Sequence, residues 1–279
     1  MSSRRNATRR PAGATGTPAP WRKVAVPALL AVAISVVVSV VAVSAWFVFF
    51  RSNEPDGPPT AAIVDQLSLT FPNPSFREEA TSTLEQAGYV VDYYPGEEVT
   101  VGFYRSLPDQ DYDLIIFRAH AARIQGVFRG EPLDETVLFT NEPYDPEGYY
   151  AEQVEARLDI AYTSVGAPKY FGITADFIEF SMQGDFDDAM VIMMGCEGLA
   201  SDRTAEAFVN KGAAGYISWT DTVTATHTDA ATERLLELLL LDDLSADDAV
   251  AQTMTDIGPD PIYGSDLRAY PPEVVARGE

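Results

Sequence analysis

The chain reads MVIMMGCEG over residues 190–198, and this stretch decides the predicted fold. A short apolar run that ends at a glycine is typical of a buried strand that turns sharply into the next element. Three similar runs precede it, at residues 61–64, 89–91 and 114–117, and another follows at residues 216–219. Buried runs separated by helical patterns indicate an α/β fold, a three-layer αβα sandwich around a mainly parallel sheet.

Helical patterns fill most of the gaps between these runs. The first helix is expected to begin at Ser75, because Glu78 follows three residues later and completes a capping box. A leucine-rich helix is expected over residues 230–241. We interpret the segment just before it, which contains His227 and Asp229, as the cap of that helix.

The connection from residue 117 to residue 190 is far longer than the usual loop of 2–6 residues. Alternating apolar residues at 136–139 and 158–162 predict a β-hairpin insertion beside the main sheet. A last extended piece at residues 267–270 predicts an edge strand, because two prolines follow it and cannot donate to a sheet ladder.

Residues 24–50 carry no charged side chain and are almost all apolar. The length of this run exceeds the roughly 20 residues needed to cross a bilayer. All the cations of the first 50 residues precede this run, and the positive-inside bias places them in the cytoplasm. A cleaved signal peptide fits less well, since the apolar run is too long. We therefore predict a basic cytoplasmic tail (1–23), a single transmembrane helix in the lipid bilayer of the cell membrane (24–50), a linker (51–59) and an extracytoplasmic domain (60–279).

The charge of the chain excludes some classes of partner. Asp and Glu number 42 against 19 Lys and Arg, and six of those cations lie before residue 50, which leaves 13 for the rest. So acidic a domain is unsuited to nucleic acid, whose phosphates need clustered cations, and it suits a halophilic setting where salt screens repulsion. One cysteine and two histidines offer neither a disulfide nor a zinc cage, so we expect no metal and no cofactor.

Residues with reactive side chains follow the predicted strands. Asp65 follows the first run, His120 the third, Cys196 the fourth and Asp221 the fifth. Ligands and catalytic groups in open α/β sheets collect at the carboxyl ends of the strands. A cysteine nucleophile needs a base beside it, and His120 could serve Cys196 if the third and fourth strands are neighbours.

Each of these residues is a weak signal when taken alone. A lone cysteine after an apolar strand is usually packing, and a lone histidine is usually a satisfied structural residue. Asp65, Glu197 and Asp221 are candidates for a substrate pocket that takes a cationic side chain. In so acidic a domain, however, solvated surface is the simpler interpretation of nearby carboxylates.

Two segments in conjunction carry more weight than any single residue. LIIFRAHA at residues 114–121 and VIMMGCEG at residues 191–198 resemble the histidine and cysteine segments of the caspase-like cysteine peptidases, the superfamily with the caspase–haemoglobinase fold. Residues 205–219 look like the helix and fifth strand of its CHAT branch. The resemblance extends over the outer domain, roughly residues 60–270.

The resemblance implies a Cys/His dyad that cleaves peptide bonds through an acyl-enzyme. By position, Cys196 would be the nucleophile and His120 the acid and base. The backbone N–H groups of Ala121 and Cys196 would be the candidates for an oxyanion hole.

The leading hypothesis is thus a hydrolase, a membrane-anchored extracytoplasmic cysteine peptidase-like protein that acts on a protein or peptide substrate. One alternative is a catalytically inactive caspase-like interaction or receptor module. Another is an anchored α/β solute-binding domain without covalent chemistry. The three hypotheses differ in what they require of Cys196. The peptidase requires a reactive thiol, the inactive module has a thiol whose alkylation has no consequence, and the solute-binding domain has a buried, unreactive thiol.

Overall fold

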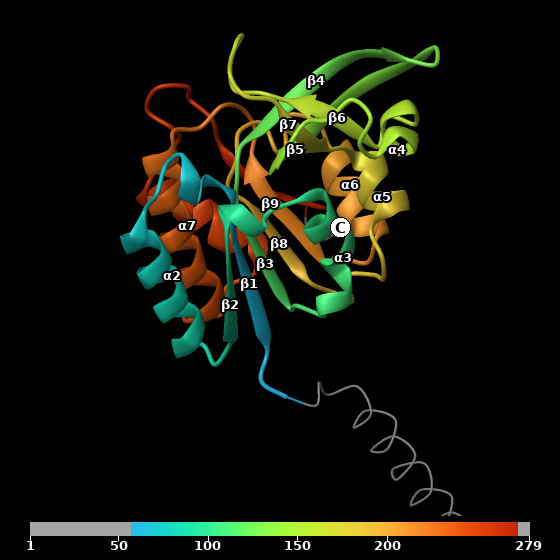
Figure 1. The fold of residues 1–279 in the computed structure, drawn as a ribbon. Helices are drawn as coiled ribbons and strands as arrows, with labels where there is room; N and C mark the ends of the chain where they lie inside the picture. Colours follow the sequence, from blue (N-terminus) through green and yellow to red (C-terminus); the bar gives the residue numbers. More distant parts are fainter. Residues whose placement is uncertain (1–56, 273–279) are drawn as a thin grey trace, which may run out of the picture. The chain divides into compact units, whose positions relative to one another are not determined.

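Figure 1 shows the computed structural model of the chain, which describes residues 57–272. The predicted cytoplasmic tail, the predicted transmembrane helix and most of the linker lie outside the described residues and stay predictions. Within residues 57–272, no helix combines the length and the apolar character that a membrane span requires.

A six-stranded sheet forms the centre of the domain, with the strand order β10-β9-β8-β3-β1-β2. Its strands are β1 (Thr60–Asp65), β2 (Val90–Pro95), β3 (Leu114–Arg118), β8 (Met190–Met193), β9 (Gly215–Trp219) and β10 (Leu267–Tyr270). The first five are mutually parallel, and β10 runs antiparallel to β9 at the edge. The predicted mainly parallel sheet and its edge strand are therefore confirmed.

Helices cover both faces of this sheet, as expected for three αβα layers (Figure 1). One face carries α2 (Pro74–Gln86), α7 (Ala225–Leu240) and α8 (Ala246–Asp256), and the other carries α3 (Val101–Ser106), α5 (Ala175–Ser181) and α6 (Arg203–Asn210). Short 3₁₀ turns occur at η2 (Gln66–Leu69), η3 (Gly96–Glu98) and η4 (Pro108–Gln110). A parallel sheet buried on both faces needs nearly continuous apolar strands, which explains runs such as LIIF in β3.

A second, antiparallel sheet forms the insertion, with the order β4-β5-β7-β6. Its elements are β4 (Ala121–Phe128), β5 (Glu131–Pro143), α4 (Tyr150–Val154), β6 (Leu158–Ala161) and β7 (Tyr170–Ile173). The two-residue turn between β4 and β5 has positive φ at both Arg129 and Gly130, the backbone geometry that suits a tight hairpin. The insertion is thus a four-stranded sheet, larger than the predicted hairpins.

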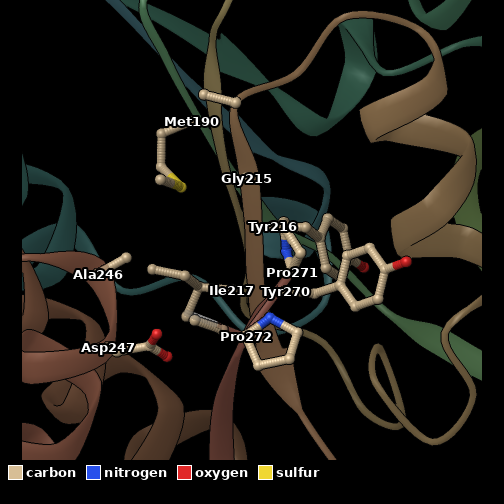
Figure 2. Close-up of a pocket in the computed structure, with 11 residues that line it drawn as sticks. Met190, Gly215, Tyr216, Ile217, Ala246, Asp247, Tyr270, Pro271 and Pro272 are labelled. Carbon is tan, nitrogen blue, oxygen red and sulfur yellow. The ribbon is translucent and has the colours of Figure 1, made fainter. Parts of the chain in front are cut away.

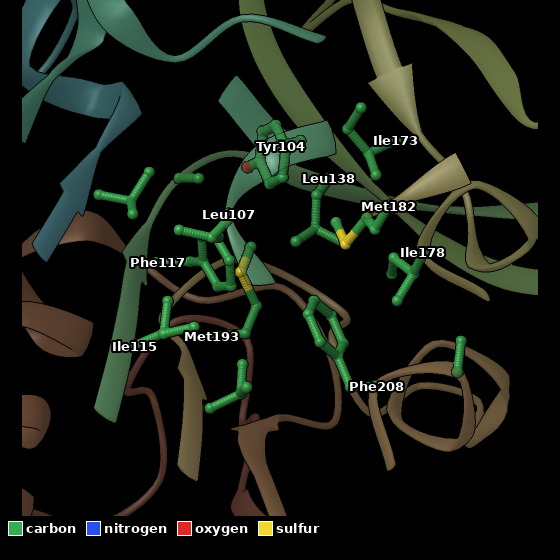
Figure 3. Close-up of a cluster of buried hydrophobic side chains, with 14 of the residues drawn as sticks. Tyr104, Leu107, Ile115, Phe117, Leu138, Ile173, Ile178, Met182, Met193 and Phe208 are labelled. Carbon is green, nitrogen blue, oxygen red and sulfur yellow. The ribbon is translucent and has the colours of Figure 1, made fainter. Parts of the chain in front are cut away.

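The two sheets share one hydrophobic core (Figure 3). Phe117 and Met193 of the main sheet meet Leu138 and Ile173 of the second sheet there, and Phe208 of α6 completes the contact. This shared core fixes the second sheet against the carboxyl ends of β3 and β8.

Two helices begin at other residues than the sequence suggested. Helix α2 begins at Pro74, and the side chain of Asn73 accepts the N–H of Phe76, so the cap is Asn73 and not Ser75. Proline favours this start because the first helical position needs no N–H donor. Helix α7 begins at Ala225, so Asp229 lies within the helix and does not cap it.

The carboxylate of Asp229 belongs to a buried ion network around Arg118. The Arg118 side chain is 1% exposed and donates to Asp229 at 2.8 and 2.9 Å and to Asp65 at 2.9 Å. It also donates to the carbonyl of Phe71 at 2.9 Å, while Asn73 donates to Asp229 at 2.8 Å. One guanidinium therefore joins β3, β1, α7 and the loop before α2.

We predict that Asp229→Ala destabilises the full-length protein by about 3–5 kcal/mol, because it leaves a buried guanidinium short of a partner. The matched control is Asp256→Ala, which removes an ion pair with Arg234 whose side chains are both about one-third exposed. Solvent screens such a surface pair, so its loss should change the stability little. Urea unfolding curves of the two variants measure the difference, and equal midpoints would contradict the prediction.

Candidate active site

The predicted neighbours β3 and β8 do lie side by side. They pair in parallel, with Phe117 opposite Met193, and the N–H of Met194 continues the ladder to the carbonyl of Phe117 at 2.9 Å. His120 follows the end of β3 by two residues and Cys196 follows the end of β8 by three. Both residues therefore lie just beyond the carboxyl ends of two adjacent parallel strands.

Gly195 allows the two strand ends to approach closely. A Cβ atom at this position would lie 2.5 Å from the carbonyl oxygen of Ala119 and 3.1 Å from the Cβ of Ala121. The first distance is too short for any side chain, and the obstacle is backbone. The segment that carries Cys196 thus runs directly along the segment that carries His120.

The Cys196 thiol is half-buried at the end of this segment. It donates to the carbonyl oxygen of Val223 at 3.6 Å and packs against the apolar cluster that includes Trp219. Burial raises the pKa of the Cys196 thiol above its ordinary value, and the negative charge of Glu197 raises it further. The thiol is therefore protonated at neutral pH.

The His120 ring lies between two aromatic rings. Its centroid is 5.9 Å from that of Phe71 and 5.7 Å from that of Phe139. Its backbone is held on both sides, because its N–H donates to the side chain of Gln66 and its carbonyl accepts the N–H of Phe139. Burial lowers the pKa of His120, so the ring is neutral at neutral pH.

The thiol and the imidazole do not share a hydrogen bond among the residues that the structure describes, since the thiol is bonded to Val223. Both groups are in their neutral forms. The arrangement therefore favours a neutral thiol and a neutral imidazole over a preformed thiolate–imidazolium pair. Any nucleophilic attack must be accompanied by transfer of the thiol proton.

The backbone N–H of Ala121 lies on the edge of β4 that faces the cysteine segment. Residues of antiparallel strands alternate between hydrogen-bonded and non-bonded pairs, and His120 is bonded to Phe139 of β5. The N–H groups of Ala121 and Arg123 therefore both point away from β5. The N–H of Arg123 donates to the carboxylate of Glu197 at 2.9 Å, so this edge of β4 faces the segment that follows Cys196.

The structure brings Glu197 and Asp221 together, with the N–H of Glu197 bonded to the carbonyl of Asp221 at 3.0 Å. Arg123, a cation that the sequence did not single out, interacts with both residues. Asp134 binds its guanidinium with two contacts of 2.6 Å and raises the pKa of Arg123, and the charges of Glu197 and Asp221 raise it further. Asp65 lies elsewhere, 2% exposed in the Arg118 network.

A pocket of about 440 Å³ opens near the amino-terminal ends of the parallel strands (Figure 2). It lies by Met190 and Gly215, the first residues of β8 and β9, whereas Cys196 follows the far end of β8. Pro271 and Pro272 line it from beyond β10. Among residues 57–272, no group of three or more His, Cys, Asp or Glu side chains is placed to hold a metal ion.

We predict that alkylation of Cys196 by iodoacetamide accelerates throughout the range from pH 7 to above pH 9. The reason is that the thiolate is the reactive form and the pKa of this thiol is raised. The chain has one cysteine, so the intact mass reports on this residue alone, and Cys196→Ser provides the blank. A rate that is already constant between pH 5 and pH 8 would indicate a stabilised thiolate and contradict the prediction.

No protein-family model matches the chain, and a search of curated proteins finds no match. Solved structures do show a similarity in fold, to the crystal structure of the Arg-specific cysteine proteinase gingipain R. The TM-score is 0.42 and the sequence identity 11%, over 72% of this chain. The matched region is 43% of the length of that protein, so this chain corresponds to less than half of it.

Proposed function

We propose that the chain is a membrane-anchored cysteine peptidase-like protein in which Cys196 and His120 cleave peptide bonds. The observation that supports this most is the close approach at Gly195, which sets the cysteine segment against residues 119–121 on neighbouring strand ends. Caspase-like membership, and the CHAT branch within it, are part of the proposal and rest on the motifs at residues 114–121, 191–198 and 205–219.

In the proposed reaction, the thiol first leaves the carbonyl of Val223 by rotation about its side-chain bond. His120 takes the thiol proton while the sulfur attacks the peptide carbonyl carbon. The carbonyl oxygen becomes an oxyanion, which accepts hydrogen bonds from the backbone N–H groups of Ala121 and Cys196. His120 then gives the proton to the leaving amine, and the C–N bond breaks to leave a thioester.

Water completes the reaction. His120, neutral again, takes a proton from the water as it attacks the thioester carbonyl, and the proton returns to the thiolate when the C–S bond breaks. Because burial lowers the pKa of His120, the imidazole is in its basic form at neutral pH. The same ring then serves both half-reactions without a further acid or base.

One observation favours an inactive interaction module as the second candidate. The thiol is bonded to Val223, and its pKa is raised, so the resting cysteine is unreactive. A protein that had lost catalysis would keep such a thiol as packing. The exposed hairpin of β4 and β5 would then be the surface for a partner.

We also propose that residues 24–50 anchor the domain in the membrane and that the domain lies outside. The support is the length of the uncharged run and the cations before it.

We predict that Cys196→Ala abolishes turnover and that His120→Gln lowers it by about 10³-fold or more, because the two side chains act as a unit. The matched control is His227→Gln, the chain's other histidine, whose ring bonds the carbonyl of Gly258. Cleavage of a mixed peptide library by the full-length protein, followed by mass spectrometry, measures the effect. Turnover that survives in Cys196→Ala would refute the peptidase and leave the interaction module.

Protease treatment of intact cells tests the anchoring. We expect external protease to remove an epitope fused after Glu279, while an epitope fused before Met1 is protected until the cells are lysed. The reverse pattern would refute the orientation, and release of the protein into the medium would refute the anchor.

A further inference from the structure

A small pocket lies on the outer face of the second sheet, between β4, β5 and β6. Its volume is about 230 Å³, below the roughly 300–1,000 Å³ of sites for drug-sized ligands. A hollow of this size suits one side chain of a larger ligand. Six of the nine lining residues are apolar, namely Ala122, Ile124, Val137, Phe139, Ile160 and Ala161, while Arg123, Asp159 and Tyr162 supply polar surface.

Small residues keep this pocket open. Ala122 and Ala161 line it with methyl groups, and Gly172 of β7 lies behind them. A Cβ atom on Gly172 would lie 2.3 Å from a methyl carbon of Val137 and 3.3 Å from the Cβ of Ala161. The glycine therefore lets the wall residues lie close to the sheet.

Two charged residues line the pocket, Arg123 and Asp159, and both have hydrogen-bond partners within the protein. The guanidinium of Arg123 is bound by Asp134, and the carboxylate of Asp159 accepts the N–H of Ile160 at 2.7 Å. The apolar contacts for an incoming side chain come from the buried walls Val137, Phe139 and Ala161, each 3% exposed.

The pocket adjoins the proposed base. The ring of Phe139 lines the pocket, and its centroid is 5.7 Å from that of His120. Side chains alternate between the faces of a strand, so His120 shares its face with Ala122 and Ile124. The imidazole therefore contacts Phe139, a residue of the pocket wall.

We infer that this pocket binds an apolar side chain of the substrate, on the residue that supplies the leaving amine. This inference rests on the proposed peptidase function and specifies its substrate. His120 must give its proton to the leaving nitrogen, so the residue that carries this nitrogen lies beside the imidazole. The neighbouring pocket then receives that residue's side chain, of the size of Leu or Phe.

A cationic side chain is less suited to this part of the site. The carboxylates that the sequence suggested for it, Glu197 and Asp221, already interact with Arg123 of the chain itself. A substrate cation would therefore approach a guanidinium.

A randomised peptide library and the full-length protein test the inference. Mass spectrometry of the products identifies the residue just after each cleaved bond. We expect Leu, Ile, Met and Phe at this position to exceed Lys and Arg by at least about tenfold, the discrimination that an apolar pocket achieves. Ala122→Trp fills the pocket and should abolish this preference, while Ile124→Ala enlarges it and should shift the preference toward Trp and Tyr.

The matched control is Val127→Trp, at a position 73% exposed on the same strand, which should leave the preference unchanged. Cleavage that depends on Cys196 but shows no apolar preference after the bond would overturn the pocket assignment alone. A preference for Lys or Arg there, or one unaffected by both pocket variants, would overturn it as well. Absence of any Cys196-dependent cleavage would overturn the proposed function and the inference together.

Discussion

The candidate active site depends on the buried guanidinium of Arg118. A buried charge is costly unless it is paired and hydrogen-bonded, and here Asp65, Asp229 and the carbonyl of Phe71 are the partners of the guanidinium. These partners belong to β1, to α7 and to the loop whose Phe71 ring contacts His120. The network therefore fixes the end of β3 two residues before the proposed base and holds one of the two rings that enclose it.

The main sheet was predictable because burial on both faces demands continuous apolar strands, a pattern visible in the chain. The same logic placed His120 and Cys196 on one edge, since parallel neighbours end together. Strand β4 escaped prediction because Arg, Gln and Gly interrupt its apolar alternation, and pairing with β5 overrides this weak local signal. The burial of Asp65 and Asp229 was equally hidden, because both depend on a distant arginine.

Burial sets the electrostatics of the proposed dyad more than charge does. It raises the pKa of the Cys196 thiol and lowers that of the His120 imidazole, and both changes oppose an ion pair. The many carboxylates of the domain do not reverse this. Near the site, Glu197 bonds the backbone N–H of Arg123 and adds to the raised pKa of the thiol.

The neutral resting state of His120 and the buried wall of the pocket share one residue, Phe139. Phe139 shields the imidazole from water and also lines the pocket, so one ring links the protonation state of His120 to the pocket that we assign to substrate. A side chain in that pocket would exclude more water from the imidazole and strengthen the hydrogen bonds that form during proton transfer, because interactions are stronger in a low dielectric. On the proposed mechanism, the thiol loses its proton when the substrate is in place, and the protein without substrate keeps an unreactive cysteine.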